Sequence, residues 1–187
     1  QRQRSAKSLP KSQPPARRPT RVASLTLAVA LGFAALPASA DIGVRFIEGA
    51  PKDRFEINNR TACAVVAAEF VIDLGASAAG LVFDVTSTGA GVEVFQPFEV
   101  VAGADALVTL PKVVDGDRQI VLSIRRLGPT ATIAFTIDVD DTLGPRGITV
   151  SGSEIEGAEV RMSAAGSTAS GRFSRQGEAL VRTPPCP

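Results

Sequence analysis

The stretch Thr132–Asp140, Thr-Ile-Ala-Phe-Thr-Ile-Asp-Val-Asp, alternates apolar and polar side chains. Successive side chains on a β-strand point to opposite faces, so every second residue shares a face. The apolar face of the expected strand consists of Ile133, Phe135, Ile137 and Val139, and the polar face of Thr132, Thr136, Asp138 and Asp140. The stretch therefore predicts a strand that is buried on one side only.

Short runs with the same period of two recur along the chain, separated by Gly, Pro, Asp and Asn, and no helix-length stretch has a period of three to four. Strands are expected at 43–48, 54–58, 64–74, 80–85, 92–101, 106–110, 118–126, 130–140, 147–150, 157–164, 169–175 and 178–182. Many short strands with frequent turns are typical of an antiparallel, immunoglobulin-like β-sandwich. The prediction is an all-β chain with one such domain at 41–187, and a closed barrel is the alternative.

The first 40 residues have the features of an export signal. They contain seven Lys and Arg and no acidic residue, then an apolar run from Val22 to Leu36, then Ala38-Ser39-Ala40. This order is typical of a signal peptide that is cleaved after a small residue, here Ala40. As a helix the apolar run would span about 22 Å, less than the roughly 30 Å of a bilayer core, which disfavours a transmembrane anchor. We therefore expect residues 1–40 to be removed and 41–187 to work in the periplasm or outside the cell, without a membrane span.

Removal of residues 1–40 changes the charge balance. The whole chain has 20 basic and 19 acidic groups, whereas 41–187 keeps 13 basic groups against the same 19 acidic ones, a net charge near −6. A nucleic-acid partner needs a basic face to neutralise phosphates, so nucleic acid is disfavoured.

The only two cysteines, Cys63 and Cys186, both lie in the expected mature part. An even pair without metal-ligand spacing predicts one disulfide in an oxidising compartment, and two separate thiols are the alternative. In the chain-entropy model, a disulfide that closes the long loop between these two cysteines stabilises the folded protein by roughly 4–5 kcal/mol. Asn59-Arg60-Thr61 matches the N-glycosylation pattern, but its expected role is a turn before Cys63.

The residue types argue against an enzyme. The chain has no His, which excludes nucleophiles activated by a histidine, and it has no Tyr. No Gly-x-Ser-x-Gly or phosphate-loop motif occurs either. Two carboxylates brought together by the fold remain as the route to a glycan-active enzyme. A carbohydrate-binding module is a related alternative, although sugar stacking uses exposed aromatic rings and the chain has neither Trp nor Tyr. The prediction is a non-catalytic module.

The densest acidic cluster, Asp138, Asp140 and Asp141, lies at the end of the expected strand 130–140. Asp138 and Asp140 share a face about 7 Å apart, and Asp141 with the Thr142 carbonyl completes a candidate set of oxygen ligands. Oxygen ligands without His or Cys favour Ca²⁺ over zinc or copper. Further donors of unknown position are Asp84, Asp115 and Asp117. The alternative is a solvated acidic face without a cation.

Several blocks of the chain, taken in order, resemble one family. They are Arg45–Phe55, Ile72–Leu74 with Gly80–Asp84, Gly91–Phe98, Phe135–Thr142 and Gly152–Val160. These blocks resemble the exported bacterial proteins named aggregation factor core. The resemblance implies a secreted β-sandwich for adhesion or contact with the envelope matrix, with calcium dependence as a further expectation. Its partner would be a cell-surface component, a protein or a glycan.

Overall fold

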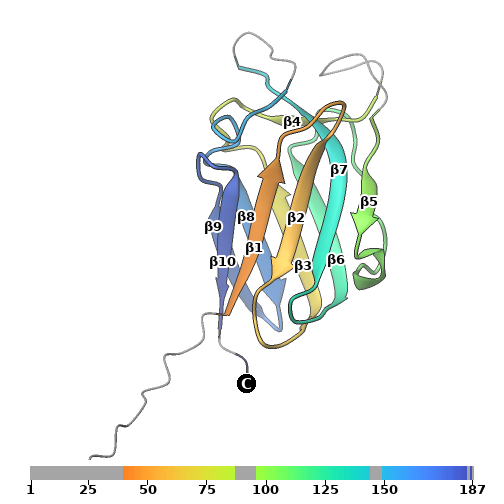
Figure 1. Cartoon of the computed structure of the whole chain (residues 1–187), viewed down its shortest axis with the longest axis vertical. Coiled ribbons are helices and arrows are strands. Elements are labelled where there is room, and N and C mark those ends of the chain that lie inside the picture. Colours follow the sequence, from red (N-terminus) through yellow and green to blue (C-terminus); the bar gives the residue numbers. More distant parts are fainter. Residues whose placement is uncertain (1–39, 87–95, 144–148, 185, 187) are drawn as a thin grey trace, which may run out of the picture. The chain divides into compact units, whose positions relative to one another are not determined.

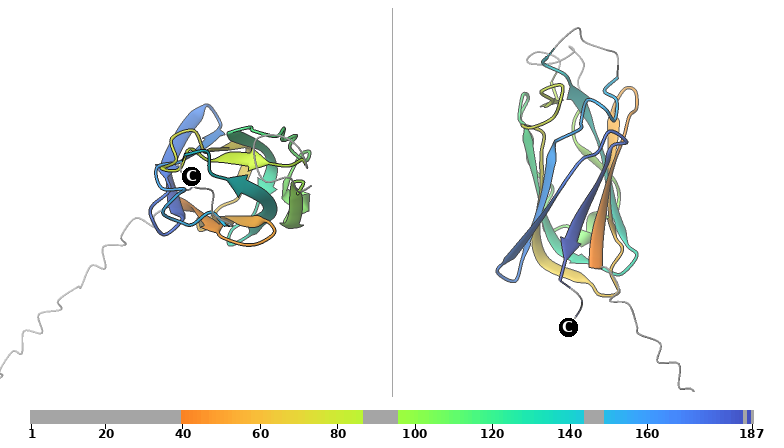
Figure 2. Two further views of the ribbon diagram at one scale, coloured as in Figure 1. Left: turned by 90° about the horizontal axis from the view of Figure 1, so that it is seen from above. Right: turned by 90° about the vertical axis from the view of Figure 1, so that its left-hand side faces the viewer.

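Two antiparallel sheets pack face to face in the computed structural model, which describes residues 40–86, 96–143, 149–184 and 186 (Figures 1 and 2). The predicted antiparallel β-sandwich is confirmed. Within the described residues, no helix has the length and apolar character needed to cross a membrane.

The first sheet has the strand order β10–β1–β2–β7–β4, and β5 also pairs with β7. Its strands are β1 (Ala40–Ile47), β2 (Asp53–Asn59), β4 (Val82–Asp84), β5 (Glu99–Ala102), β7 (Thr132–Asp140) and β10 (Glu178–Thr183). The second sheet has the order β6–β3–β8–β9. Its strands are β3 (Val65–Asp73), β6 (Gln119–Leu127), β8 (Glu159–Ala164) and β9 (Ser167–Arg172).

Two expected strands do not form in the described residues. In place of a strand at 106–110, the chain makes a 3₁₀ turn, η1 (Ala104–Ala106), and one isolated bridge from Leu107 to Ile124. Pro111 follows at once, and its missing N–H cannot extend the ladder. Residues 149–150 of the expected strand 147–150 are not extended in a sheet, and residues 147–148 lie outside the described part. The expected strand 92–101 is observed from Glu99 onward, and its residues 92–95 also lie outside that part.

The core lies between the sheets and centres on Phe55 of β2, which is fully buried. Its ring packs against four other phenylalanine rings, with centroids 5.2 to 6.4 Å away: Phe46, Phe83, Phe135 and Phe173. These rings come from β1, β4, β7 and the segment between β9 and β10. The apolar face predicted for Thr132–Asp140 is confirmed, since its four apolar residues are all buried.

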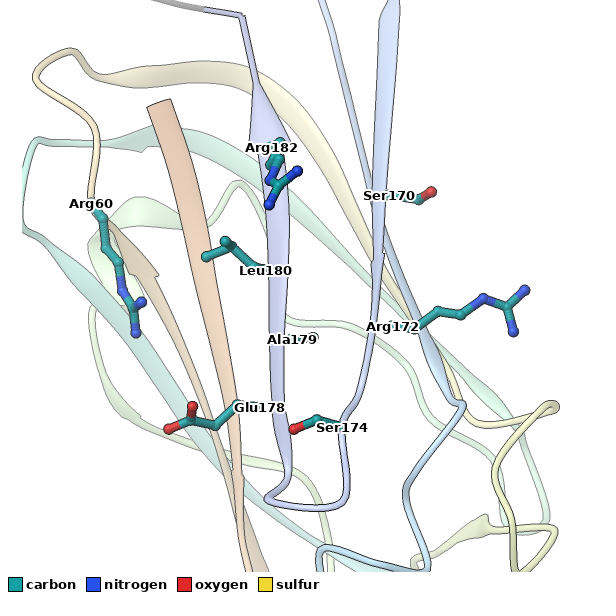
Figure 3. Close-up of a pocket in the computed structure, with 8 residues that line it drawn as sticks. All are labelled: Arg60, Ser170, Arg172, Ser174, Glu178, Ala179, Leu180 and Arg182. Atoms are coloured by element: carbon teal, nitrogen blue, oxygen red, sulfur yellow. The ribbon is translucent and has the colours of Figure 1, made fainter. Parts of the chain in front are cut away.

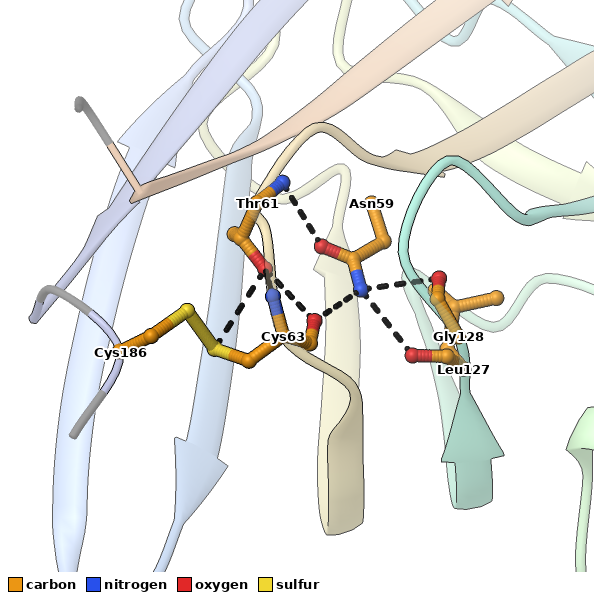
Figure 4. The surroundings of a disulfide bond; sticks show 6 residues. All are labelled: Asn59, Thr61, Cys63, Leu127, Gly128 and Cys186. Atoms are coloured by element: carbon orange, nitrogen blue, oxygen red, sulfur yellow. Dashed lines mark hydrogen bonds between the residues drawn. A yellow bond between two sulfur atoms is a disulfide. The ribbon is translucent and has the colours of Figure 1, made fainter.

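The disulfide between Cys63 and Cys186 is present, as predicted (Figure 4). It joins the C-terminal tail to the turn before β3, and Asn59 organises that turn. The Nδ2 of Asn59 donates to the carbonyls of Cys63, Leu127 and Gly128 at 2.8 to 3.0 Å, and its Oδ1 accepts from the Thr61 N–H. Asn59 is fully buried, so its amide is occupied by the fold and is not exposed for glycosylation.

Replacing Phe55 by Ala is expected to lower the free energy of unfolding by about 3–5 kcal/mol. The substitution leaves a cavity among the four neighbouring rings, and these rings can relax into it only in part. Urea denaturation followed by far-ultraviolet circular dichroism would measure the change. Phe98→Ala is the matched control: Phe98 is half-buried and packs on Phe135 with centroids 4.9 Å apart. Its loss should be clearly smaller, and equal losses would contradict a core centred on Phe55.

A candidate cation site between strands β4 and β7

Strands β4 and β7 bring three aspartates to one side of the first sheet. Phe83 of β4 pairs with Val139 of β7, and both side chains point into the core. Because side chains alternate along each strand, the neighbouring carboxylates face away from the core. Asp84 therefore lies directly opposite Asp138, and Asp140 lies two residues further along the same face.

Three carboxylate oxygens converge here, one each from Asp84, Asp138 and Asp140, all within 4.8 Å of one another. Asp84 is 1% exposed, Asp140 is also buried, and Asp138 is half-buried. Among the described residues, the buried Oδ2 of Asp84 has no hydrogen-bond partner. A buried carboxylate oxygen without a partner is costly, so a ligand bound here would relieve that cost.

Two further carboxylates border the group. The Oδ1 of Asp115 accepts a hydrogen bond from the Val85 N–H at 3.2 Å, and the Asp115 carboxyl interacts with that of Asp84. On the other side, Asp53 accepts from the N–H groups of Gly49 and Val139 at 3.0 and 3.2 Å. Electrostatic interactions link the five aspartates in the order Asp53, Asp138, Asp140, Asp84 and Asp115, and we call these five residues the acidic row.

Burial and mutual repulsion make these carboxylates hard to ionise. Burial raises the pKa of Asp84 to about 7, and the Asp115 and Asp140 carboxyls add to the rise. Burial likewise raises the pKa of Asp53 to about 8, although the Gly49 N–H opposes it. The pKa of Asp138 rises to about 6 through burial and the nearby Asp140. Near neutral pH, the row can therefore hold either protons or a cation.

The geometry and ligand types suit calcium. Ca²⁺ binds oxygen at about 2.3–2.6 Å, so two oxygens on the same ion lie at most about 5 Å apart. The three oxygens lie within 4.8 Å of one another, which is compatible with ligands of a single Ca²⁺ ion. Mg²⁺ binds at about 2.0–2.1 Å in a strict octahedron, and zinc prefers His or Cys ligands, so both fit this all-carboxylate group less well.

The expected cluster and the observed group share two residues. The structure brings Asp138 and Asp140 together, as the alternation of the strand predicts. Among the described residues, Asp141 is not part of the converging group, although it is buried, and Asp84 stands in its place. The Thr142 hydroxyl donates to the Gly80 carbonyl at 2.6 Å. Asp117 accepts from the Val114 N–H in a turn. Asp84 and Asp115 were donors of unknown position in the sequence; the pairing of β4 with β7 places Asp84, and the hydrogen bond from Val85 places Asp115 beside it.

Two surface hollows lie away from this group, and they bear on the alternative of a glycan-active enzyme. One hollow, of about 510 Å³, is lined by Arg60, Arg172, Arg182 and neighbouring residues of β9 and β10 (Figure 3). The other, of about 650 Å³, lies beside the disulfide. Glu178 is the single carboxylate among the residues that line the two. Most glycoside hydrolases use two carboxylates on either side of the bond that is cleaved, so neither hollow favours that chemistry.

No family model matches the chain, and no curated protein or solved structure is found to be similar to it. The resemblance to the aggregation factor core proteins therefore stays a prediction.

Without divalent cations, the protein is expected to lose stability as the pH rises from about 4 to 8. A carboxyl whose pKa is higher in the folded than in the unfolded state, about 4, binds its proton more tightly when folded. The contribution of such a carboxyl to the free energy of unfolding is fully present below pH 4. It is lost as the pH rises through the pKa values in the folded state, which are about 6 to 8 for Asp138, Asp84 and Asp53. Melting temperatures in the presence of a chelator would show the slope.

The variant Asp84→Asn tests the origin of this slope, because asparagine cannot ionise. At pH 8 without cations it should melt higher than the unmodified protein, whereas at pH 4.5 the two should be close. Asp105→Asn, at an exposed position in η1, should keep the original slope. If the melting temperature rises between pH 5 and 8 and is the same in Asp84→Asn, ionisation of Asp84 is not the origin of the slope.

Proposed function

We propose that this chain is an exported, non-catalytic β-sandwich module that binds Ca²⁺ through Asp84, Asp138 and Asp140 and makes adhesive contacts with a cell surface or envelope matrix. The observation that supports it best is the convergence of three carboxylate oxygens within 4.8 Å of one another, one of them from Asp84, whose buried Oδ2 has no hydrogen-bond partner among the described residues. Export is supported by the signal-like first 40 residues, and the disulfide is compatible with an oxidising compartment.

A cation would relieve the main electrostatic cost of the site. Like charges a few ångströms apart repel strongly where burial reduces solvent screening. Among the described residues, neither Asp84 nor Asp138 forms an ion pair with a basic side chain. A divalent ion would balance the negative charge of these carboxylates and would coordinate the buried oxygen of Asp84 that has no hydrogen-bond partner among the described residues. The remaining Ca²⁺ ligands would come from water or from backbone carbonyls.

The position of the group links cation binding to recognition. Asp84 is the last residue of β4 and Asp140 is the last residue of β7, so both carboxylates lie where a strand ends and the chain leaves the sheet. Binding residues of sandwich domains commonly lie on the loops that follow strand ends, held in place by a rigid scaffold. An ion shared by Asp84 and Asp140 would hold the ends of both strands together, with residues 85–86 and 141–143 that follow them. The partner surface would then depend on calcium.

Calcium binding can be tested directly on the purified protein. Titration calorimetry at pH 7.5 should show one Ca²⁺ per chain, with a higher melting temperature on binding. Asp84→Asn and Asp138→Asn should each weaken binding at least tenfold, because each removes one charged ligand. Asp105→Asn should bind like the unmodified protein, and Mg²⁺ should bind more weakly. Absence of heat together with an unchanged melting temperature would overturn the calcium site.

Adhesion needs a separate test. In the presence of Ca²⁺ the protein is expected either to self-associate, measured by light scattering, or to sediment with bacterial cell envelopes or their polysaccharide. A chelator and the Asp84→Asn variant should abolish the effect, and Asp105→Asn should retain it. If Ca²⁺ binds but neither association occurs, the ion has a structural role alone and the adhesive function is wrong.

A further inference from the structure

One side of the sandwich is closed by two edge strands from different sheets. β9 ends the second sheet and β10 ends the first, and the Ser174 N–H donates to the Glu178 carbonyl at 2.8 Å where the chain turns between them. The two strands approach closely at Gly171, where a Cβ atom would collide with the carbonyl of Leu180. Beyond that point they diverge toward the end of the sandwich that carries the C-terminus (Figure 2, right). We call this line of contact the β9–β10 seam.

The two hollows lie along this seam and share Arg182. The apolar one, of about 650 Å³, opens where the strands diverge, and its volume is that of a typical small-ligand site. Small and apolar side chains line much of it: Ala64, Val66, Met162, Ala164, Ala169 and Pro184. Cys63 and Cys186 also line it, so the disulfide holds the C-terminal tail as one of its walls.

The neighbouring polar hollow supplies positive charge that the fold does not use. Arg60 and Arg182 are exposed, and among the described residues neither forms an ion pair. By contrast, Arg172 in the same hollow approaches Glu159 at 4.0 Å. It also projects away from Arg60 and Arg182 (Figure 3).

The guanidinium of Arg60 lies directly over Gly43 of β1, where a Cβ atom would come within 2.5 Å of its Nε. A glycine at this place lets the Arg60 side chain rest against the sheet. The guanidinium thus rests against β1, the neighbour of β10 in the sheet, which restricts its motion and lowers the entropy lost when it binds an anion.

From these features we propose that the β9–β10 seam binds a single-chain anionic amphiphile. The apolar chain lies in the hollow between Ala64, Met162 and Ala169, and the anionic head lies at its mouth against Arg182, with Arg60 as a second cation. Arg182 is the residue that joins the two halves of the site, because it lines both hollows. A carboxylate or a phosphate head would satisfy the guanidinium groups equally.

This site is independent of the calcium proposal. The acidic group lies at the β4 end of the sandwich, whereas the apolar hollow lies beside the C-terminal tail at the opposite end (Figure 1). Failure of one site therefore says nothing about the other.

Four probes below their micelle-forming concentrations separate the contributions of head and chain. With the disulfide-intact protein in calorimetry, dodecanoate and dodecyl phosphate are expected to bind one per chain. Dodecanol should bind at least tenfold more weakly, because it lacks the charge, and acetate should not bind measurably, because it lacks the chain. Equal binding of dodecanol and dodecanoate, or of acetate and dodecanoate, would overturn the proposal, as would no binding by any probe.

Variants place the ligand in the seam. Arg182→Gln should weaken dodecanoate about tenfold or more, since a charge-assisted hydrogen bond is lost, and should leave dodecanol unchanged. Arg175→Gln is the matched control, because Arg175 is exposed, lies 3.9 Å from Glu156 and lines neither hollow. Ala169→Leu should weaken dodecanoate and dodecanol together by filling the apolar hollow. An unchanged affinity in Arg182→Gln would overturn the site even if Ala169→Leu failed to fold.

A last experiment distinguishes binding of a single amphiphile molecule from docking on a membrane surface. Vesicles of phosphatidylglycerol carry the same kind of head and chain, but in a bilayer. The proposal expects monomeric dodecanoate to bind in their absence. Sedimentation with vesicles without any binding of monomeric amphiphile would show a membrane-docking face instead, and would overturn the proposal.

Discussion

The packing of Phe55 against four other rings is the interaction on which the described structure depends most. Three of those rings lie on β1, β4 and β7, strands of the same sheet, and the fourth, Phe173, lies between β9 and β10 and closes the seam side. Such pairs contribute about 0.5–1.5 kcal/mol each beyond their buried area. Phe55 is therefore the common contact of segments that are far apart in the chain, and it sets how deeply each sits in the core.

That core also determines where the carboxylates lie. With Phe83 and Val139 inside, alternation places Asp84, Asp138 and Asp140 outside, and a slip of one residue between β4 and β7 would turn the carboxylates toward the phenylalanine rings. Burying an unpaired carboxylate in apolar surroundings costs far more than the register could gain. The three converging carboxylates and the aromatic core thus lie on opposite faces of the same pair of strands. The stability that the core provides offsets the cost of bringing the carboxylates together.

The sequence predicted the parts that depend on local pattern. The alternation of Thr132–Asp140 was sufficient for β7, for its buried face and for the shared side of Asp138 and Asp140, and two cysteines allow only one intramolecular disulfide. The place of Asp84 depends on which strand pairs with β7 and in which register, and neither is visible in a short window. Asp141 was expected to close the group with the Thr142 carbonyl where the strand gives way to a loop, but it lies just beyond the end of β7 and, among the described residues, is buried outside the converging group. At 106–110, a 3₁₀ turn and Pro111 prevented the ladder that the apolar residues suggested.

The seam follows from a different constraint, the meeting of two sheets at their edges. Gly171 allows the backbones of β9 and β10 to approach, and the hairpin between β8 and β9 turns on Ala165 and Gly166, both with positive φ, as a tight two-residue turn requires. Small residues on this hairpin, such as Ala164 and Ala169, cannot fill the space that opens where the strands diverge. An alternating strand of large apolar residues would have closed that space and extended the core. The composition of β9 therefore keeps this end of the sandwich open, and the disulfide holds the tail beside it so that the opening has a fixed wall.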